Sequence, residues 1–178
     1  MLTTVSGPPG SGTTTTAEHV AARLDIRFVP GGEVFRAMAS ERGMSLPDFG
    51  LYATEHPEVD VELDARLAGI AREGGVIIES RLAGWIVRNE GLAAVTVWID
   101  CDPAVRAARV AEREGTSLAR ARAENDERQR VERERYLATY GIDLADLSIY
   151  DLVLDSTTAT PGDLAEQVVV RMHKRFSG

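Results

Sequence analysis

Residues 7–16 read GPPGSGTTTT, and this stretch decides which fold the rest of the chain can adopt. It fits the pattern G-x-x-x-x-G-K-[ST], a loop that wraps nucleotide phosphates, except that Thr13 stands where the pattern has lysine. The loop follows an apolar run and opens a helical stretch, and the N-terminus of a helix favours an anion. A glycine-proline turn whose threonines only cap the next helix is the alternative. We expect a phosphate-binding loop formed by Gly7, Pro8, Pro9, Gly10, Ser11, Gly12, Thr13, Thr14 and Thr15.

The missing lysine leaves the phosphate loop without its usual positive charge. Threonine at position 13 donates a hydrogen bond, but it cannot neutralise phosphate oxygens as an ammonium group does. Phosphoryl transfer is catalysed mainly by positioning and electrostatic stabilisation, so other cations must supply the charge. Arginine suits this task because its planar guanidinium binds phosphate oxygens bidentately. Thr14 is the position whose hydroxyl would bind Mg²⁺.

The bulk composition is that of an ordinary globular domain. The 178 residues suit one domain, with 44% hydrophobic and 27% charged residues. No run approaches the ~18 apolar residues of a membrane span, and the N-terminus lacks the basic region of a signal peptide. Cys101 is the single cysteine, so we expect a buried, unreactive thiol and no intrachain disulfide. Together these features favour the cytoplasm.

The charge balance limits the partners of the protein. The net charge of −8 argues against a general affinity for nucleic acid or anionic membranes. Lys174 is the only lysine among 20 basic residues, so clustered arginines must hold any anionic ligand. Excess acid with little lysine suggests a salt-rich, halophilic cytoplasm, where screening makes self-repulsion tolerable. GC-rich coding, which also replaces lysine by arginine, accounts for the composition equally well.

Short apolar runs alternate with longer helical patterns along the chain. The runs expected to be strands are 2–5, 27–29, 76–79, 95–99 and 152–154. Helical stretches are expected near 13–24, 32–42, 46–55, 58–73, 81–89, 103–114, 117–140 and 161–176. This alternation predicts an α/β fold in which a five-stranded parallel sheet is flanked by helices. The successive helices of 32–73 exceed a simple crossover and predict an inserted subdomain.

The segment 117–140 is polar on nearly every side. In its stretch ENDERQRVERER, residues 124–135, Val131 is the only apolar residue. Such a helix cannot pack into a core, so it bridges solvent or forms a mobile cover. The alternative is a permanently exposed helix held by ion pairs such as that of Arg128 with Glu132, spaced i,i+4.

Several arginines fall where they could meet the phosphate loop. Arg106, Arg109 and Arg113 share one face of a helix because they are spaced i, i+3 and i+7. Arg81 follows the strand at 76–79, at the edge where open parallel sheets bind ligands. Each alone is more often a solvated surface residue, but together with the loop they predict a cage for two nucleotides. The other candidates are Arg36, Arg128 and Arg135.

Blocks along almost the whole chain resemble the archaeal-type cytidylate kinases, which are nucleoside monophosphate kinases of the P-loop superfamily. The blocks are GPPGSGTTT, GGEVFR (31–36), GMSLPDFGLYATEHPEVDVELD (43–64), ESRLAGW (79–85), VRAARVAEREG (105–115), ERERYLATYGID (132–143) and DLSIYDLVLD (146–155). In that family threonine often replaces the loop lysine, so the resemblance makes Thr13 a family trait. It implies an adenylate-kinase-like P-loop NTPase fold with a nucleotide-monophosphate-binding (NMP-binding) insert and a lid.

The resemblance also implies an activity and a division of the chain. The activity is Mg²⁺-dependent transfer of the ATP γ-phosphate to CMP or dCMP, giving CDP or dCDP and ADP, by a monomer. The single domain 1–178 would comprise a core of about 1–31, 74–116 and 141–178, an insert of about 32–73, and a lid of about 113–140. Another monophosphate acceptor (AMP, UMP or dTMP) and a non-catalytic nucleotide-binding factor are the alternatives.

Individual residues receive roles from the same resemblance. The loop would bind the ATP phosphates, Gly32 and Arg36 the phosphate of CMP, and Arg81 both the acceptor and the γ-phosphate. The arginines expected to close on the transferring group are Arg109, Arg113 and Arg128, with Arg135 as a further candidate.

Three acidic residues complete the implied site. Asp60 or Asp64 would accept a hydrogen bond from the cytosine amino group, although a solvated helix face is an alternative for both. Glu79 would orient Mg²⁺ through water, or would instead pair structurally with Arg81. Ser80 departs from the family pattern, where glycine is expected, and its larger side chain would tighten the turn that aims Arg81.

Overall fold

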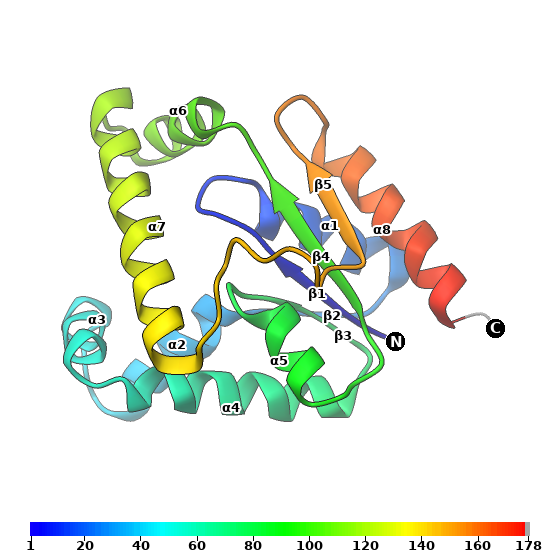
Figure 1. The fold of residues 1–178 in the computed structure, drawn as a ribbon, viewed down its shortest axis with the longest axis horizontal. Coiled ribbons are helices and arrows are strands. Elements are labelled where there is room, and N and C mark those ends of the chain that lie inside the picture. The colour runs from blue at the N-terminus through cyan, green and yellow to red at the C-terminus, as the bar shows by residue number, and fades with distance from the viewer. Residues whose placement is uncertain (177–178) are drawn as a thin grey trace.

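The computed structural model describes residues 1–176, and its core is one five-stranded parallel sheet (Figure 1). The strands lie in the order β2-β3-β1-β4-β5, and every neighbouring pair is parallel. Their bounds are β1 (Leu2–Ser6), β2 (Arg27–Pro30), β3 (Val76–Glu79), β4 (Val95–Asp100) and β5 (Leu152–Asp155). The predicted fold class is confirmed, and the predicted strands are correct to within one residue at each end.

Helices cover both faces of the sheet, so the strands β1, β3 and β4 are buried along nearly their whole length. One face packs against α1 and α8 through residues such as Val20 and Val168, and the other against α4 and α5 through Leu67 and Val87. The helices are α1 (Thr13–Leu24), α2 (Gly31–Glu41), α3 (Leu46–Glu55), α4 (Glu58–Glu73), α5 (Ala83–Asn89), α6 (Pro103–Glu114), α7 (Leu118–Tyr140) and α8 (Pro161–Phe176).

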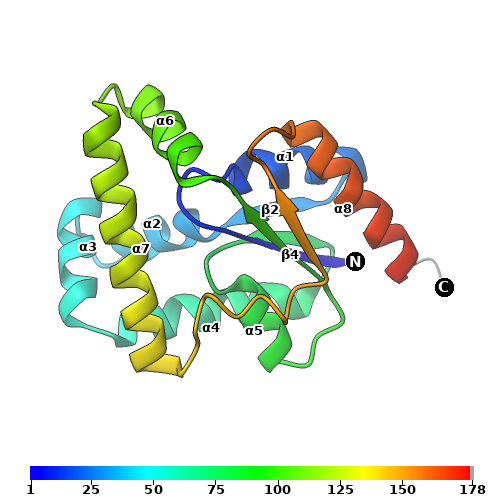
Figure 2. The ribbon, with the colours of Figure 1, turned by 45° about the horizontal axis from the view of Figure 1, so that its top comes forward.

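The helices α2, α3 and α4 share a small apolar cluster of their own. Its centre is Phe49, which is fully buried and contacts Phe35 with a ring-centroid distance of 4.7 Å. The long helix α7 runs from α6 toward α4. Figures 1 and 2 show it passing alongside the carboxyl ends of the strands. An ion pair between Asp60 of α4 and Arg135 of α7 joins the two helices.

Local signals explain most helix starts. Asp102 accepts hydrogen bonds from the backbone N–H groups of Ala104 and Val105, so α6 begins at Pro103 as predicted. The helix expected near 81–89 is present, but α5 begins only at Ala83. Ser80 causes the difference, because its hydroxyl accepts a hydrogen bond from the N–H of Leu82 and closes a turn.

The structure bears on two further predictions, one about the cysteine and one about membrane-spanning helices. The Cys101 side chain is 5% exposed, which confirms a buried thiol. Within residues 1–176, no helix combines the length and the apolar character needed to cross a bilayer.

Candidate active site

The predicted phosphate loop connects β1 to α1 at the carboxyl edge of the sheet. Gly10 and Gly12 adopt φ values of 80° and 85°, which favour glycine. Gly7 has no room for a side chain, because an added Cβ would lie 2.4 Å from the carbonyl oxygen of Ile99. No side chain caps the first turn of α1, so its N–H groups stay available to an anion.

Thr13, at the lysine position, is turned toward the neighbouring strand. Its side chain is buried, and its hydroxyl donates a hydrogen bond of 2.9 Å to the carboxylate of Glu79 at the end of β3. A neutral donor therefore contacts the acid that we predicted to act near Mg²⁺. Arg81, the alternative partner predicted for Glu79, forms its ion pair with Glu132 instead.

A cavity of about 430 Å³ lies in front of this loop. The loop, the α2–α4 region, the turn after β3 and the helix α7 all contribute to its walls. It contains most of the predicted site residues: Pro8, Pro9, Gly10, Thr13, Thr14, Gly32, Asp60, Asp64, Glu79, Arg81, Arg113, Arg128 and Arg135. Segments far apart in the sequence thus meet around one space.

The charges that line the cavity balance in number within the described chain. Four arginines line it, and so do four carboxylates, which are Asp60, Asp64, Glu79 and Glu132. Because the cavity has no excess positive charge of its own, an incoming phosphate competes with these carboxylates for the guanidinium groups.

Glu132 of α7 holds two of the arginines. Its oxygens accept hydrogen bonds of 2.8 Å from Nε of Arg81 and 2.8 Å from Nε of Arg128. Burial raises the pKa of Glu132, but the charges and hydrogen bonds of both arginines outweigh it and leave the pKa below its ordinary value. Arg81 also donates to the carbonyl oxygen of Gly7, so it bridges α7 and the phosphate loop.

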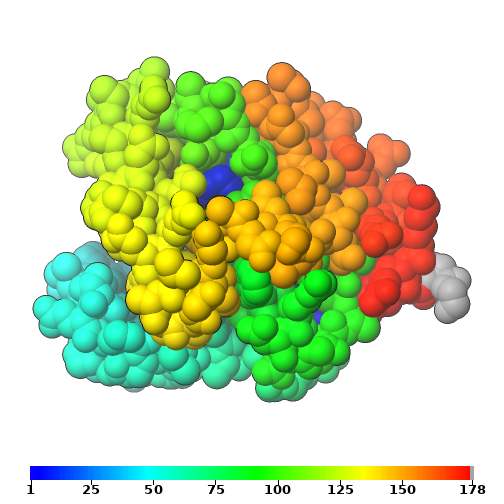
Figure 3. All heavy atoms as spheres, viewed as in Figure 1, coloured from blue at the N-terminus to red at the C-terminus, as the bar shows by residue number. Residues whose placement is uncertain are grey.

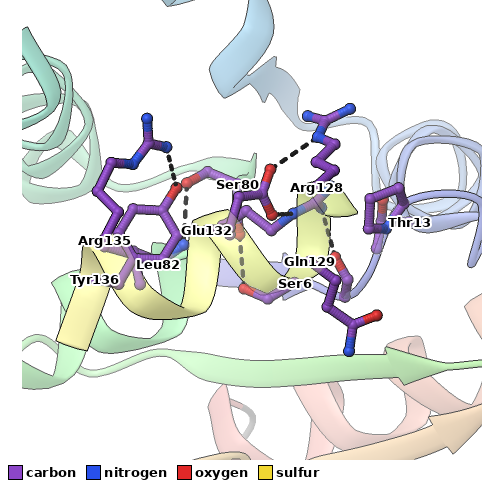
Figure 4. Close-up of polar contacts among 12 residues, drawn as sticks. Ser6, Thr13, Ser80, Leu82, Arg128, Gln129, Glu132, Arg135 and Tyr136 are labelled. Carbon is purple, nitrogen blue, oxygen red and sulfur yellow. Dashed lines mark hydrogen bonds and ion pairs between the residues drawn. The ribbon is translucent and has the colours of Figure 1, made fainter. Parts of the chain in front are cut away.

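Figure 4 shows these contacts from the side of α7. Arg128 and Glu132 are drawn as a pair on this helix. A second contact, from the Ser6 hydroxyl to the carbonyl oxygen of Ser80 at 2.8 Å, ties β1 to the turn that carries Arg81. The turn that carries Arg81 is therefore held by β1 through Ser6 and by α7 through Glu132.

The acidic pair of α4 faces the same cavity near Arg135. Asp60 lies 3.2 Å from Nε of Arg135, although neither atom makes a well-aligned hydrogen bond. Burial raises the pKa of Asp60, against the charge of Arg135. Burial, together with the negative charge of Asp60, raises the pKa of Asp64 to about 6. Desolvated carboxylates of this kind are candidates for a ligand contact.

Six predicted residues do not line the cavity. Four of them belong to the phosphate loop but do not reach the cavity wall: Gly7, Ser11, Gly12 and Thr15. The side chains of Arg36 and Arg109 also lie outside the cavity lining. Arg36 is 57% exposed and lies 4.0 Å from Glu33, next to Gly32. Arg109 donates hydrogen bonds to the hydroxyl and the carbonyl oxygen of Ser156, so the structure does not bring it to the cavity.

The helical face of Arg106, Arg109 and Arg113 therefore separates into three environments. Arg106 is 4% exposed and contacts the phosphate loop from behind, Arg109 contacts Ser156, and Arg113 lies exposed at the cavity rim. The i, i+3, i+7 spacing predicted a common face correctly, but not the different partners of its members.

The burial of Glu132 was not expected from the sequence. The i,i+4 spacing predicted the Arg128–Glu132 pair only as a surface contact, whereas the Glu132 side chain is 11% exposed and also binds Arg81. The available signal was the i,i+4 spacing of Arg128 and Glu132, which says nothing about a third partner from the turn after β3.

A smaller cavity of about 280 Å³ flanks α7 on another side of the loop. Pro8, Pro9, Gln129 and Leu144 are among its lining residues. Figure 3 shows atoms of the N-terminal segment in blue at the base of an opening between α7 and the chain that follows it. The helix α7 thus crosses the phosphate loop with open space beside it.

Comparison with known proteins agrees with this arrangement. The profile of the Cytidylate kinase-like family matches residues 3–158. The chain belongs to this family. A cytidylate kinase from Pyrococcus horikoshii is 48% identical over 161 residues, which cover 90% of this chain and 82% of the relative. One from Halobacterium salinarum is 41% identical over 170 residues, covering 95% of this chain and 88% of the relative.

Solved structures support the fold of this family member. A shikimate kinase from Bacteroides thetaiotaomicron superimposes with a TM-score of 0.65 at 15% identity, covering 100% of this chain and 99% of that chain. An uncharacterized protein from Eubacterium ventriosum gives a TM-score of 0.76 at 15% identity, covering 98% and 99%. At this level of identity, the likeness concerns the fold alone.

Proposed function

We propose that this protein transfers the γ-phosphate of ATP to the phosphate of CMP or dCMP, with Mg²⁺ bound beside ATP. The products are ADP and CDP or dCDP. The observation that carries the proposal is the cavity in which the phosphate loop, four arginines and the acidic pair of α4 surround one space. Curated relatives named cytidylate kinase, at 41–48% identity, support CMP as the acceptor.

The donor phosphates bind the loop. The N–H groups of the loop and of the first turn of α1 surround the β- and γ-phosphates, with the helix N-terminus adding positive potential. Mg²⁺, which neutralises phosphate charge when bound, would be held by the Thr14 hydroxyl and, through water, by Glu79. Residues 1–176 contain no group of three His, Cys, Asp or Glu ready for a metal, so phosphates and water would complete its coordination.

The acceptor binds on the side of α2–α4. Gly32 and Arg36 hold the phosphate of CMP, and Arg36 has to swing from its exposed position to do so. Asp60 or Asp64 accepts a hydrogen bond from the cytosine amino group. A uracil would present a carbonyl oxygen to the same carboxylate, so the contact discriminates against UMP.

The transfer itself needs positioning and positive charge, not a base. A phosphate oxygen of CMP attacks the γ-phosphorus in line, the bond to the β-phosphate oxygen breaks, and the acceptor is already an anion. Arg81 and Arg128 stabilise the charge of the transferring group, together with Arg113 at the rim. Arg135 contributes to the closed site from α7, whereas Arg109 stays bound to Ser156 and takes no direct part in the transfer.

The helix α7 acts as the lid. Its polar surface suits a helix that is solvated when the site is open, and its arginines reach the phosphates when it is closed. Closure excludes water, which would otherwise hydrolyse ATP. On this assignment the lid spans about 113–140 and the acceptor-binding insert about 32–73.

A kinase for another monophosphate is the second candidate, since only a few contacts of the insert select the base. A non-catalytic nucleotide-binding factor is the third, because such a protein does not need a loop lysine. The arginines around the cavity argue against the third candidate, since simple binding needs no cations on a mobile helix.

A coupled assay of ADP release tests the proposal directly. ATP is supplied with CMP, dCMP, AMP, UMP or dTMP in turn, at low and at molar KCl. We expect kcat/KM for CMP or dCMP to exceed that for the other acceptors by at least about a hundredfold. Preference for another acceptor would support the second candidate. ATP binding with no CDP formed would support the third.

A further inference from the structure

A buried arginine lies directly behind the phosphate loop, outside the cavity. Arg106 of α6 is 4% exposed. Its guanidinium donates hydrogen bonds to the carbonyl oxygens of Pro9 and Cys101, both at 3.3 Å, and to Oε1 of Gln129 at 3.2 Å. All three acceptors are neutral, and no carboxylate within residues 1–176 forms an ion pair with Arg106.

An unpaired buried charge is costly, so its retention requires a physical reason. Water is almost excluded from Arg106, and carbonyl groups return only part of the lost hydration energy. A bound anion nearby would offset the remaining cost. The phosphate loop, which Arg106 contacts through Pro9, is the nearest anion-binding element.

The contact with Pro9 also orients the loop. The peptide bond from Pro9 to Gly10 is trans, since the described chain has no cis peptide, so its C=O and N–H point in opposite directions. Holding the carbonyl oxygen of Pro9 therefore turns the N–H of Gly10 away from Arg106. Gly10 lines the cavity, and α6 packs so closely on its other side that an added Cβ would lie 2.8 Å from the carbonyl oxygen of Arg106.

We propose that Arg106 is a positioning residue that supplies, from behind the loop, the fixed positive charge that Thr13 cannot provide. The guanidinium aims the N–H of Gly10 at the donor phosphates and strengthens it as a hydrogen-bond donor. The charge acts through the loop, without touching the nucleotide. This inference rests on the proposed use of ATP, but not on the identity of the acceptor.

Contact with Gln129 links the same guanidinium to the lid. Gln129 follows Arg128 on α7, so one neutral amide joins the buried cation to the helix that closes over the site. Figure 4 shows Gln129 beside Arg128 on this helix. Since an amide does not cancel charge, the field of Arg106 on the loop is preserved.

Calorimetry with ADP and with adenosine tests the proposal, because only ADP carries phosphates. The variants are Arg106→Gln, Arg106→Lys and the double variant Arg106→Gln/Thr13→Lys, each first checked for folding. For Arg106→Gln we expect ADP affinity to fall at least about tenfold, with adenosine affinity unchanged. The lysine variant keeps the charge but not the three-way hydrogen bonding of the guanidinium, so its loss should be smaller than that of Arg106→Gln and confined to ADP. The double variant should recover most of the lost ADP affinity.

Three results would overturn the inference. One is an equal loss for ADP and adenosine in Arg106→Gln, which would mean a merely structural role. Another is a folded double variant that recovers nothing. The third is a folded Arg106→Lys variant that loses affinity for ADP and for adenosine equally, which decides the matter even if Arg106→Gln does not fold. If the parent protein itself does not bind ADP, the proposed function fails, whereas an Arg106→Gln variant that binds ADP as tightly as a binding parent refutes only this inference.

Discussion

Among single residues, Glu132 connects the geometry of the site most directly to the proposed reaction. Its carboxylate binds the guanidinium groups of Arg81 and Arg128, to which we assign the binding of the transferring phosphate. Carboxylate and phosphate oxygens present similar acceptors to arginine. On the proposed mechanism, Glu132 holds the two arginines in place until the nucleotides replace it.

Replacing this carboxylate without changing its size tests that role. Glu132→Gln leaves Arg81, whose side chain is 16% exposed, without its ion-pair partner. We expect the free energy of unfolding to fall by about 3 kcal/mol without ligand. Addition of ADP and CMP should reduce the difference, because phosphates then pair with the arginines. Urea denaturation with and without ligands measures both effects.

Glu134→Gln is the matched control, since Glu134 pairs with Arg130 on the exposed side of α7. It should change stability by less than about 0.5 kcal/mol. A loss in Glu132→Gln no larger than in this control, or one that ligands leave untouched, would contradict the role.

The raised pKa of Asp64 predicts an unusual pH dependence. With a folded pKa of about 6 and an unfolded pKa of about 3.9, ionisation of Asp64 destabilises the fold. The contribution of Asp64 to the free energy of unfolding is therefore most favourable when the pH is below both pKa values. It is lost as the pH rises through the folded pKa of about 6. Asp64→Asn should be about 1–3 kcal/mol more stable than the parent at pH 8, and the gain should vanish toward pH 4.

Urea unfolding across this pH range measures the effect. Asp143→Asn is the control, because a backbone hydrogen bond from Ala145 and a side-chain hydrogen bond from Arg133 lower the pKa of Asp143. At neutral pH the Asp143→Asn variant should be less stable than the parent, whereas Asp64→Asn should be more stable. If the Asp64 variant is less stable than the parent at pH 8, the assignment of a desolvated carboxylate is wrong.

The sequence predicted which residue types line the site better than it predicted the hydrogen-bond and ion-pair partners of those residues. Thr13 and the need for arginine were visible in one motif, and most predicted residues do line the cavity. The burial of Arg106 and Glu132 was not visible, because both belong to polar helix patterns. Their environments depend on contacts from the phosphate loop, from the turn after β3 and from the residue after β4, which no local spacing encodes.

At the scale of elements, periodicity was a reliable guide. Apolar runs fixed the five strands, and caps such as Asp102 fixed helix starts. The helix α5 begins at Ala83, later than expected, because a side-chain hydrogen bond of Ser80 competes with the helical backbone. The polar pattern of α7 predicted its exposure, but not that Tyr136 would pack against Leu82 and Ile142.

The small cluster around Phe49 predicts that α2–α4 can be loosened without damage to the phosphate loop. Phe49→Leu leaves a cavity in this cluster, which contacts neither β1 nor α1. We expect KM for CMP to rise several-fold while ADP affinity stays within about twofold of the parent. Steady-state kinetics and calorimetry measure the two quantities.

Val168→Ala in α8 is the control, because it removes a fully buried side chain from the cluster beside α1. Both variants should lose about 1–3 kcal/mol of stability, but the control should leave KM for CMP unchanged. Equal effects of both variants on KM would refute a separate acceptor-binding role for α2–α4.

At the scale of the whole molecule, the net charge of −8 predicts a response to salt. Screening relieves the repulsion among excess carboxylates, while the exposed ion pairs that it weakens are worth about 0–1 kcal/mol each. We therefore expect the free energy of unfolding to rise from low to molar KCl. Urea denaturation at several KCl concentrations measures it, and a flat or falling dependence would favour GC-rich coding as the origin of the composition.

The whole account depends on guanidinium groups acting where the loop has no lysine. Single-turnover measurement of CDP formation by Arg81→Ala and Arg128→Ala, at saturating ATP and CMP, tests this most directly. The account predicts that the rate falls roughly 10³- to 10⁵-fold in each folded variant, as for other arginines that contact a transferring phosphoryl group. A fall of only a few-fold in both variants would contradict it.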